Sequence, residues 1–209
     1  GNFHPTEGKL RPVHVLHRGE ISQQRGVASP GMLPLGQGLS WQIDAATTEG
    51  ERRATLANWL TDERHPLVWR SIVNRMWQYH FGRGIVATPN DFGRMGAAPT
   101  HPELLDWLAV EFRGADWDIK RLLKTMVMSA TYRQSAELRG DLAKADPRNI
   151  RLGRGPRFRL EAEMVRDQAL ALSGLRSVKM YGPSVYPPQP PNLWQAAFNG
   201  QRDWSTSHG

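Results

Sequence analysis

The chain has 209 residues, 39% of them hydrophobic, a formal net charge of +7 and an isoelectric point near 10.2. It has no cysteine, which excludes disulfides, thiol catalysis, cysteine-ligated zinc and the C-x-x-C-H motif of covalently attached haem, so no cofactor is expected. No apolar run approaches the roughly 18 residues of a membrane span, and the strong positive charge favours anionic partners.

The first 48 residues favour an extended arm. Val13, Val15 and Leu16 in PVHVLHRG predict one short strand, and a loop rich in Gly, Pro and Ser follows. No second strong strand pattern appears, which argues against a large sheet. Because the helical period starts at residue 49, we predict an arm over 1–48 and a helical domain over 49–209.

Three segments with helical periodicity come next, over residues 49–62, 65–82 and 100–114. In the second, apolar residues recur at steps of three and four and predict a buried stripe, which Gly82 ends. The stripe consists of Trp69, Ile72, Val73, Met76, Trp77 and His80. One side of the third helix carries Leu104, Leu105, Leu108 and Phe112.

Two more helices are predicted, over residues 116–134 and 157–175, with Gly174 ending the second of them. From Lys179 onward, the proline-rich tail suits polyproline II. The predicted fold class is therefore mainly α: an irregular bundle of about five helices with an extended N-terminal arm and a Pro-rich C-terminal tail.

The loop TPNDFGRMGAAPTHPE, residues 88–103, precedes the third helix. Thr100 and Glu103 have the spacing of a capping box, in which the hydroxyl accepts from a backbone N–H and the carboxylate returns the bond. Pro102 falls in the first turn, where no intrahelical donor is needed. These residues are therefore interpreted as the start of a helix.

Three other side chains of this loop are candidates for catalysis. Asp91 and His101 would form an acid–base pair, and Arg94 would hold an anionic group beside it. Each also has a structural interpretation: Asp91 as a turn former, His101 as a packed histidine and Arg94 as a neutralising partner of Asp91.

The remaining histidine and acidic patterns favour structural roles. His80 closes an apolar stripe and is predicted to be partly buried. His14 and His17 would point to opposite faces of a strand, and no metal site is predicted. Glu163 and Asp167 share a helix face, which suits either a salt-bridged surface or the carboxylate pair of a glycosidase.

Arginines are concentrated between residues 148 and 166. Arginine suits bidentate binding of carboxylate, sulfate or phosphate, although pairing with the chain's own acids is the other interpretation. The scattered basic residues and the lack of a helix-turn-helix pattern argue against a nucleic-acid reader. With two aromatic residues of the tail, the arginines predict an anion-binding surface of Arg151, Arg154, Arg157, Arg166, Tyr186 and Trp194.

Four segments, in this order, resemble a known family: NRMWQYHFGRGIVATPNDFGRMGAAPTHPELLDWLAVEF, SATYRQS, RLEAEMVRDQALALSG and GPSVYPPQPPNLW. The chain is similar to the planctomycete-specific domain of unknown function found near the C-terminus of cytochrome-c-type multidomain proteins. The resemblance implies an extracytoplasmic location, periplasmic or secreted, and a haem domain elsewhere in the parent protein. It also implies that the domain continues past DWSTSHG with a further Arg-rich helical stretch.

Two functions are therefore expected as alternatives. The first is an accessory module of an exported multidomain protein, which binds anionic polysaccharide or an acidic neighbouring domain through the arginine-rich and aromatic surface. The second is a hydrolase of polysaccharide or ester substrates that uses Asp91 and His101. The sequence does not decide whether the protein is an enzyme.

Overall fold

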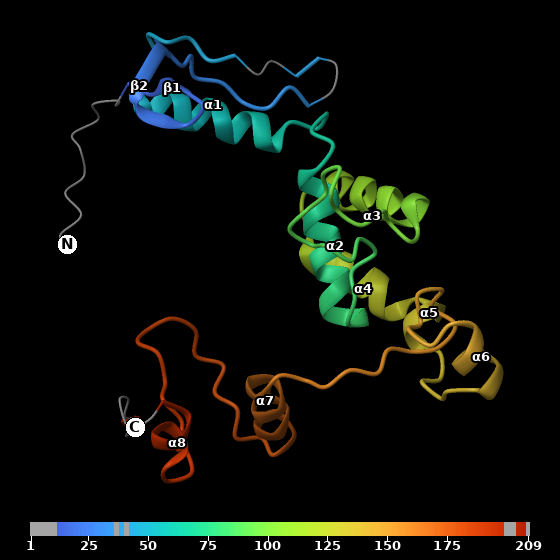
Figure 1. Cartoon of the computed structure of the whole chain (residues 1–209). Coiled ribbons are helices and arrows are strands. Elements are labelled where there is room, and N and C mark those ends of the chain that lie inside the picture. The colour runs from blue at the N-terminus through green and yellow to red at the C-terminus, as the bar shows by residue number, and fades with distance from the viewer. Residues whose placement is uncertain (1–11, 36–37, 40–41, 199–203, 208–209) are drawn as a thin grey trace. The chain divides into compact units, whose positions relative to one another are not determined.

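The computed structural model describes residues 12–35, 38–39, 42–198 and 204–207, so parts of the predicted arm lie outside the described residues. The chain is mainly α-helical, as predicted (Figure 1). It divides into two compact units, residues 1–158 and residues 159–209. Within the described ranges, no helix is both long enough and apolar enough to cross a membrane.

The N-terminal arm contains a β-hairpin, where the sequence predicts one strand. Strand β1 (His14–His17) pairs antiparallel with β2 (Glu20–Val27). The turn residues Arg18 and Gly19 have φ angles of 50° and 79°, as a tight hairpin turn with left-handed residues requires. The second strand gave no sequence signal because every residue of EISQQRGV is exposed, so no apolar alternation marks it.

Helix α1 (Glu49–Thr61) begins with a capping box that the sequence analysis did not single out. Thr48 Oγ1 accepts a hydrogen bond from the Glu51 N–H, and the Glu51 carboxylate accepts one from the Thr48 N–H. No residue of this helix is fully buried. Among the described residues, α1 therefore contributes no member to the buried hydrophobic cluster.

The core of the first unit lies where α2 (Val68–Phe81), α3 (Pro102–Gly114) and α4 (Ile119–Met128) pack together. Most residues of the predicted stripes on α2 and α3 are buried or partly buried, which confirms them. As predicted, Gly82 ends α2, with a left-handed φ of 79°. The cluster of buried residues consists of Trp69, Val73, Trp77, Ile85, Val86, Leu105, Leu108, Ala109, Phe112, Leu122 and Met126.

The prediction of one continuous helix over 116–134 is wrong, because the structure has two helices in this range. Ser129 ends α4, and its Oγ accepts a hydrogen bond of 3.1 Å from the Tyr132 N–H, which starts the short helix α5 (Ala130–Arg133). A capping serine thus separates two helices that the apolar pattern joined. A further short helix, α6 (Gly140–Ala145), occurs in the polar stretch, where none was predicted.

The second unit begins with α7 (Ala162–Leu172), which is shorter than the predicted helix over 157–175. Gly174 has a φ of 72°, in agreement with its predicted role as a helix stop. A short helix, α8 (Leu193–Phe198), follows the proline-rich stretch. Beyond it, the Trp204 indole donates a hydrogen bond of 2.8 Å to the Pro187 carbonyl.

Candidate functional site

The loop that follows α2 is attached to the middle of α2 by a buried polar contact. Asn74, which is fully buried, donates from its amide to the Val86 carbonyl at 3.0 Å and accepts from the Val86 N–H at 2.8 Å. A Cβ atom on Gly84 would lie 2.7 Å from the Asn74 amide nitrogen, so only glycine fits there. Thr100 then donates from its backbone N–H to the Ile85 carbonyl at 3.0 Å.

The predicted capping box at Thr100 and Glu103 does not form. His101, not Thr100, is the N-cap of α3, and its side chain makes no capping hydrogen bond. The Thr100 hydroxyl is engaged elsewhere, with the Ile85 carbonyl at 3.3 Å and the His101 Nδ1 at 2.9 Å. Pro102 does occupy the first turn, as predicted.

The three candidate catalytic side chains of this loop have different surroundings. Asp91 Oδ1 accepts a hydrogen bond of 2.8 Å from the Gly93 N–H, which is the turn-forming arrangement. Arg94 is exposed and, within the described part of the chain, makes no side-chain hydrogen bond or ion pair. His101 is half-buried. No hydrogen bond joins Asp91 to His101 in the described residues, and His101 lines a cavity to which Asp91 and Arg94 do not contribute.

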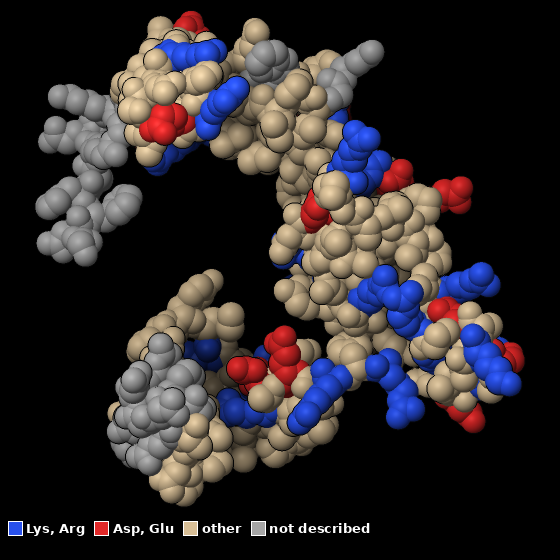
Figure 2. Space-filling view, viewed as in Figure 1, with Lys and Arg blue, Asp and Glu red and all other residues tan. Residues whose placement is uncertain are grey.

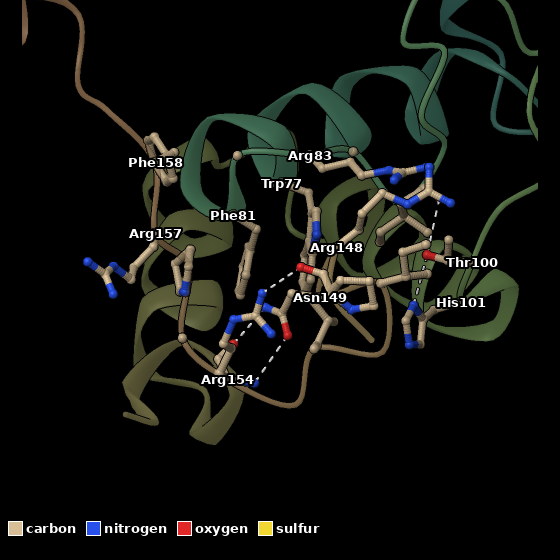
Figure 3. Close-up of a pocket in the computed structure, with 18 residues that line it drawn as sticks. Trp77, Phe81, Arg83, Thr100, His101, Arg148, Asn149, Arg154, Arg157 and Phe158 are labelled. Carbon is tan, nitrogen blue, oxygen red and sulfur yellow. Dashed lines mark hydrogen bonds between the residues drawn. The ribbon is translucent and has the colours of Figure 1, made fainter. Parts of the chain in front are cut away.

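This cavity, of about 300 Å³, lies between the end of α2 and the segment 147–158 (Figure 3). Thr100 and His101 close another part of its wall. Its charged and aromatic lining consists of Arg83, Arg148, Arg154, Arg157 and His101, together with Trp77, Phe81 and Phe158. Among the residues that the structure describes, no aspartate or glutamate lines it, so the charged side chains of the lining are basic.

Asp146 fixes the backbone of the segment 147–158 through hydrogen bonds. It is buried, with 8% of its surface exposed, and it accepts hydrogen bonds from the N–H groups of Arg151 at 2.7 Å and Ile150 at 2.9 Å. The bond from the Arg151 N–H, together with that from Ile150, lowers the Asp146 pKa below its usual 3.8, although burial opposes the shift. The carboxylate therefore fixes the backbone of the cavity wall.

Asn149 and Arg154 are hydrogen-bonded to each other within the same segment. The Asn149 amide donates to the Arg154 carbonyl at 2.8 Å and accepts from the Arg154 N–H at 3.2 Å. The Arg154 guanidinium donates to the carbonyls of Asp146 and Pro147, at 3.3 Å and 2.9 Å. The Arg154 guanidinium thus stabilises the cavity wall through these hydrogen bonds, and Arg154 also lines the cavity.

The wall is also attached to the residues that follow α5. The Gln134 amide donates to the Leu152 carbonyl at 2.7 Å, and the Gly155 N–H donates to the Ser135 carbonyl at 2.8 Å. A side chain on Gly155 would come within 2.7 Å of the Gln134 carbonyl oxygen. Backbone and amide contacts therefore hold the cavity wall in place before any ligand arrives.

Three arginines of the lining differ from Arg154. In the described part of the chain, the side chains of Arg83, Arg148 and Arg157 have no hydrogen bond or ion pair. In the view of Figure 3, Arg83 lies toward the end where Thr100 and His101 are, and Arg157 lies at the other end, pointing away from the Trp77 and Phe81 rings.

Basic side chains are also numerous around the cavity. Figure 2 shows Lys and Arg side chains gathered over the part of the first unit that carries α5, α6 and the segment after them, with acidic side chains among them. Those acids include Asp141, which forms an exposed ion pair of 3.6 Å with Arg139. Asp141 is thus an exposed acid of α6, and it does not line the cavity.

The predicted anion-binding residues are divided by the structure. Arg154 and Arg157 line the cavity, whereas Arg151 does not. Arg166, Tyr186 and Trp194 belong to the second unit. There, Arg166 approaches Asp167 at 3.7 Å, and the Tyr186 and Trp194 rings contact Trp204 with centroid distances of 5.2 Å and 5.0 Å.

Sequence reasoning missed Arg83 and Phe158, and it left Arg148 out of the predicted surface. Arg83 stands alone between two glycines after α2, where no charge pattern marks it. Phe158 was assigned to a helix that in fact begins at Ala162. The signal that could have found Arg148 was its place in the arginine-rich stretch.

No metal site is evident in the described ranges, because no three His, Asp or Glu side chains gather closely enough there to hold an ion. His80 instead donates from Nδ1 to the Met76 carbonyl at 2.7 Å and is half-buried, as predicted. His14 and His17 bond within the hairpin, to the Arg25 carbonyl and the Gln23 amide oxygen.

A sequence model of one family matches residues 52–208, which is most of the chain. That family is described as a protein of unknown function, DUF1553, and the chain belongs to it. No curated protein and no solved structure matches the chain significantly.

Proposed function

We propose that this member of the DUF1553 family is a binding module that holds an anionic group of a polysaccharide in the arginine-lined cavity. The observation that carries the proposal is the lining itself: four arginines and a histidine surround a cavity of about 300 Å³ that no carboxylate enters. Three of those arginines have no protein partner among the described residues. Their charges are left for a ligand.

The chemistry of the lining suits a carboxylate, sulfate or phosphate group. Arginine presents a planar set of N–H donors that pairs bidentately with such groups, and charge-assisted bonds are the strongest hydrogen bonds in proteins. The volume is at the lower end of the roughly 300–1,000 Å³ typical of small-molecule sites. It suits about one sugar unit with its anionic substituent.

The structure favours binding over hydrolysis as the basis of the proposal. General acid–base catalysis requires an acid and a base placed on the same substrate. His101 lines the cavity, but Asp91 does not, and its Oδ1 accepts the Gly93 N–H. The described lining offers cations that can bind an anion and aromatic rings that can contact the apolar part of a ligand, but no carboxylate that could act as an acid or a base.

The wider setting proposed for this module is a larger exported protein of the planctomycete type, with a haem domain elsewhere in that protein. This part of the proposal comes from the family resemblance. A polysaccharide-binding module would keep such a protein close to an acidic extracellular matrix.

The test is calorimetric titration of the protein with tetragalacturonate, whose carboxylates are carried on sugar rings. We expect binding that weakens as salt is added, because exposed charges are screened. Replacing Arg83, Arg148 and Arg157 together by Gln should weaken binding by at least about tenfold, since hydrogen bonds to charged groups contribute roughly 1.5–3 kcal/mol each.

A matched variant removes the same charge elsewhere. Lys120, Lys124 and Lys179 are exposed, lie outside the cavity, and make no side-chain ion pair or hydrogen bond in the described residues. Changing these three to Gln should leave the affinity within about twofold of the wild type, apart from a small effect of net charge. An equal loss in both triple variants would show that only overall charge matters and would contradict the proposed site.

A further inference from the structure

We infer that Phe158 is a specificity-determining residue of this cavity, which selects anions carried on a sugar ring over anions that have no ring. This inference rests on the proposed function. It adds a second recognition element, an aromatic surface for the ring, to the cations that bind the charge.

Two of the three aromatic residues in the lining stack on each other. Trp77 and Phe81 stack face to face, with ring centroids 3.8 Å apart and planes inclined by 8°. Trp77 is only 5% exposed. Tyr132 also approaches Phe81 edge-on, at 5.6 Å. Trp77 therefore has little free surface for a ligand, and the Phe81 ring is partly covered by Trp77 and Tyr132.

Phe158 differs because it is 45% exposed while still lining the cavity. Its ring lies against Gly82, where an added Cβ would come 3.0 Å from Phe158 Cδ1. Gly82 has a left-handed φ of 79°, which ends α2 and leaves the room that the ring occupies. The ring is therefore supported on one side and available to solvent elsewhere.

The cations of the lining are spread along the cavity: Arg157 lies at the same end as Phe158, and Arg83 extends toward the end where Thr100 and His101 lie (Figure 3). Arg157 is the neighbour of Phe158 in the chain, and Arg83 follows directly after Gly82, which the Phe158 ring contacts. Both guanidinium groups lack a protein partner among the described residues. A saccharide with one ring resting its C–H groups on Phe158 would thus have Arg157 at that end and the other arginines of the lining along the rest of the cavity.

A ligand without a ring would use the same site differently. A linear polyanion would contact the arginines alone, and an exposed phenylalanine would contribute nothing to its binding. Ring-binding sites combine apolar or aromatic surface with a few placed polar groups. An uncovered aromatic ring beside unpaired guanidinium groups has that combination, which is why the structure points to an acidic saccharide.

The experiment compares two probes on the full chain, tetragalacturonate and tripolyphosphate, which has no ring. We expect Phe158→Ala to weaken tetragalacturonate binding roughly three- to tenfold, the range that aromatic contacts contribute. Tripolyphosphate should bind the variant as it binds the wild type. Phe158→Leu, which keeps apolar volume without an aromatic face, should behave like Phe158→Ala with the saccharide.

Tyr79→Ala is the matched control, because Tyr79 is an aromatic residue that is 64% exposed on α2 and does not line the cavity. It should change neither affinity. Unchanged saccharide affinity in Phe158→Ala, or an equal loss for both probes, would overturn the inference while leaving anion binding intact. Wild-type protein that binds neither probe in a salt-sensitive way would instead overturn the proposed function, and this inference with it.

Discussion

His65 is a buried ionisable residue that the sequence analysis did not single out. It is 3% exposed, and its Nδ1 accepts hydrogen bonds of 3.2 Å from the N–H groups of Leu67 and Val68 at the start of α2. Its ring also meets Trp59 of α1 edge-on, with centroids 4.5 Å apart. One neutral imidazole therefore caps α2 and contacts α1.

Burial lowers the His65 pKa below its usual 6.5, although the charge of Asp62 opposes the shift. As pH falls below 6.5, the unfolded chain takes up the proton first, so this group's contribution to stability is lost progressively. We expect the free energy of unfolding to fall more steeply between pH 7 and pH 5 in the wild type than in His65→Asn, measured by urea denaturation.

His65→Asn keeps a neutral acceptor at every pH, so all other titrating groups cancel in the comparison. Asp62, whose pKa is lowered to about 2 by hydrogen bonds from Arg64, stays ionised across this range in both proteins. Parallel pH profiles for the two proteins would show that His65 does not titrate on unfolding. At pH 7.5, His65→Ala should cost about 1–2 kcal/mol through the lost cap.

At the scale of elements, the segment from Asp146 to Phe158 positions the cavity without being a helix or a strand. Its shape comes from side chains that bond to backbone: Asp146 to two N–H groups, Asn149 to Arg154, and the Arg154 guanidinium to two carbonyls. Such a wall is preorganised, and preorganisation reduces the cost of binding.

Asp146→Asn tests this role of the wall. An amide offers one acceptor oxygen and an NH₂ group, so one of the two N–H donors would lose its partner. We expect faster hydrogen exchange at Ile150 and Arg151 and a roughly threefold weaker affinity for tetragalacturonate, since the wall would have to be ordered on binding. Asp141→Asn, at an exposed acid of α6, is the control. Amides as well protected as in the wild type would contradict the role given to Asp146.

Helices were predictable from sequence to different degrees for a physical reason. The apolar residues of α2 and α3 recur with the helical period of 3.6 residues, because each helix packs one face onto the core. This spacing can be read from a short stretch of sequence. Capping is less predictable, because it depends on competing partners. Thr48 and Glu51 form a capping box, whereas Thr100 and Glu103 have the same spacing and do not, since the Thr100 hydroxyl contacts Ile85 and His101.

At the scale of the whole molecule, the division of the chain falls between Phe158 and Arg159. Residues 157–161 are neither helix nor strand, and Arg157 and Arg159 are exposed. Among the described residues, all members of the buried hydrophobic cluster belong to the first unit. The two units are connected by this short segment, which includes two residues of the proposed site, Arg157 and Phe158.

Limited trypsin digestion should accumulate a fragment that ends at Arg157 or Arg159, because exposed backbone outside regular structure is cut first. Tetragalacturonate should slow the cut after Arg157 by about threefold or more, since a bound arginine is not free to enter the protease. The cut after Arg176, an exposed residue of the second unit, is the internal control. Mass spectrometry of the fragments gives the order of cleavage. Early cuts within α2 to α4 would contradict the order expected here.

The sequence by itself determined the helical class, the core stripes, the helix stop at Gly82 and the excess of positive charge, because each depends on neighbours within a few residues. Only the tertiary structure decided that Arg83, His101 and Arg148 share a cavity and that Phe158 lies on Gly82. Those contacts join segments far apart in the chain, and a local pattern carries no record of them. Asp91 and His101, which are closer in sequence, make no hydrogen bond to each other in the described residues, because a turn and the Thr100 hydroxyl engage them separately.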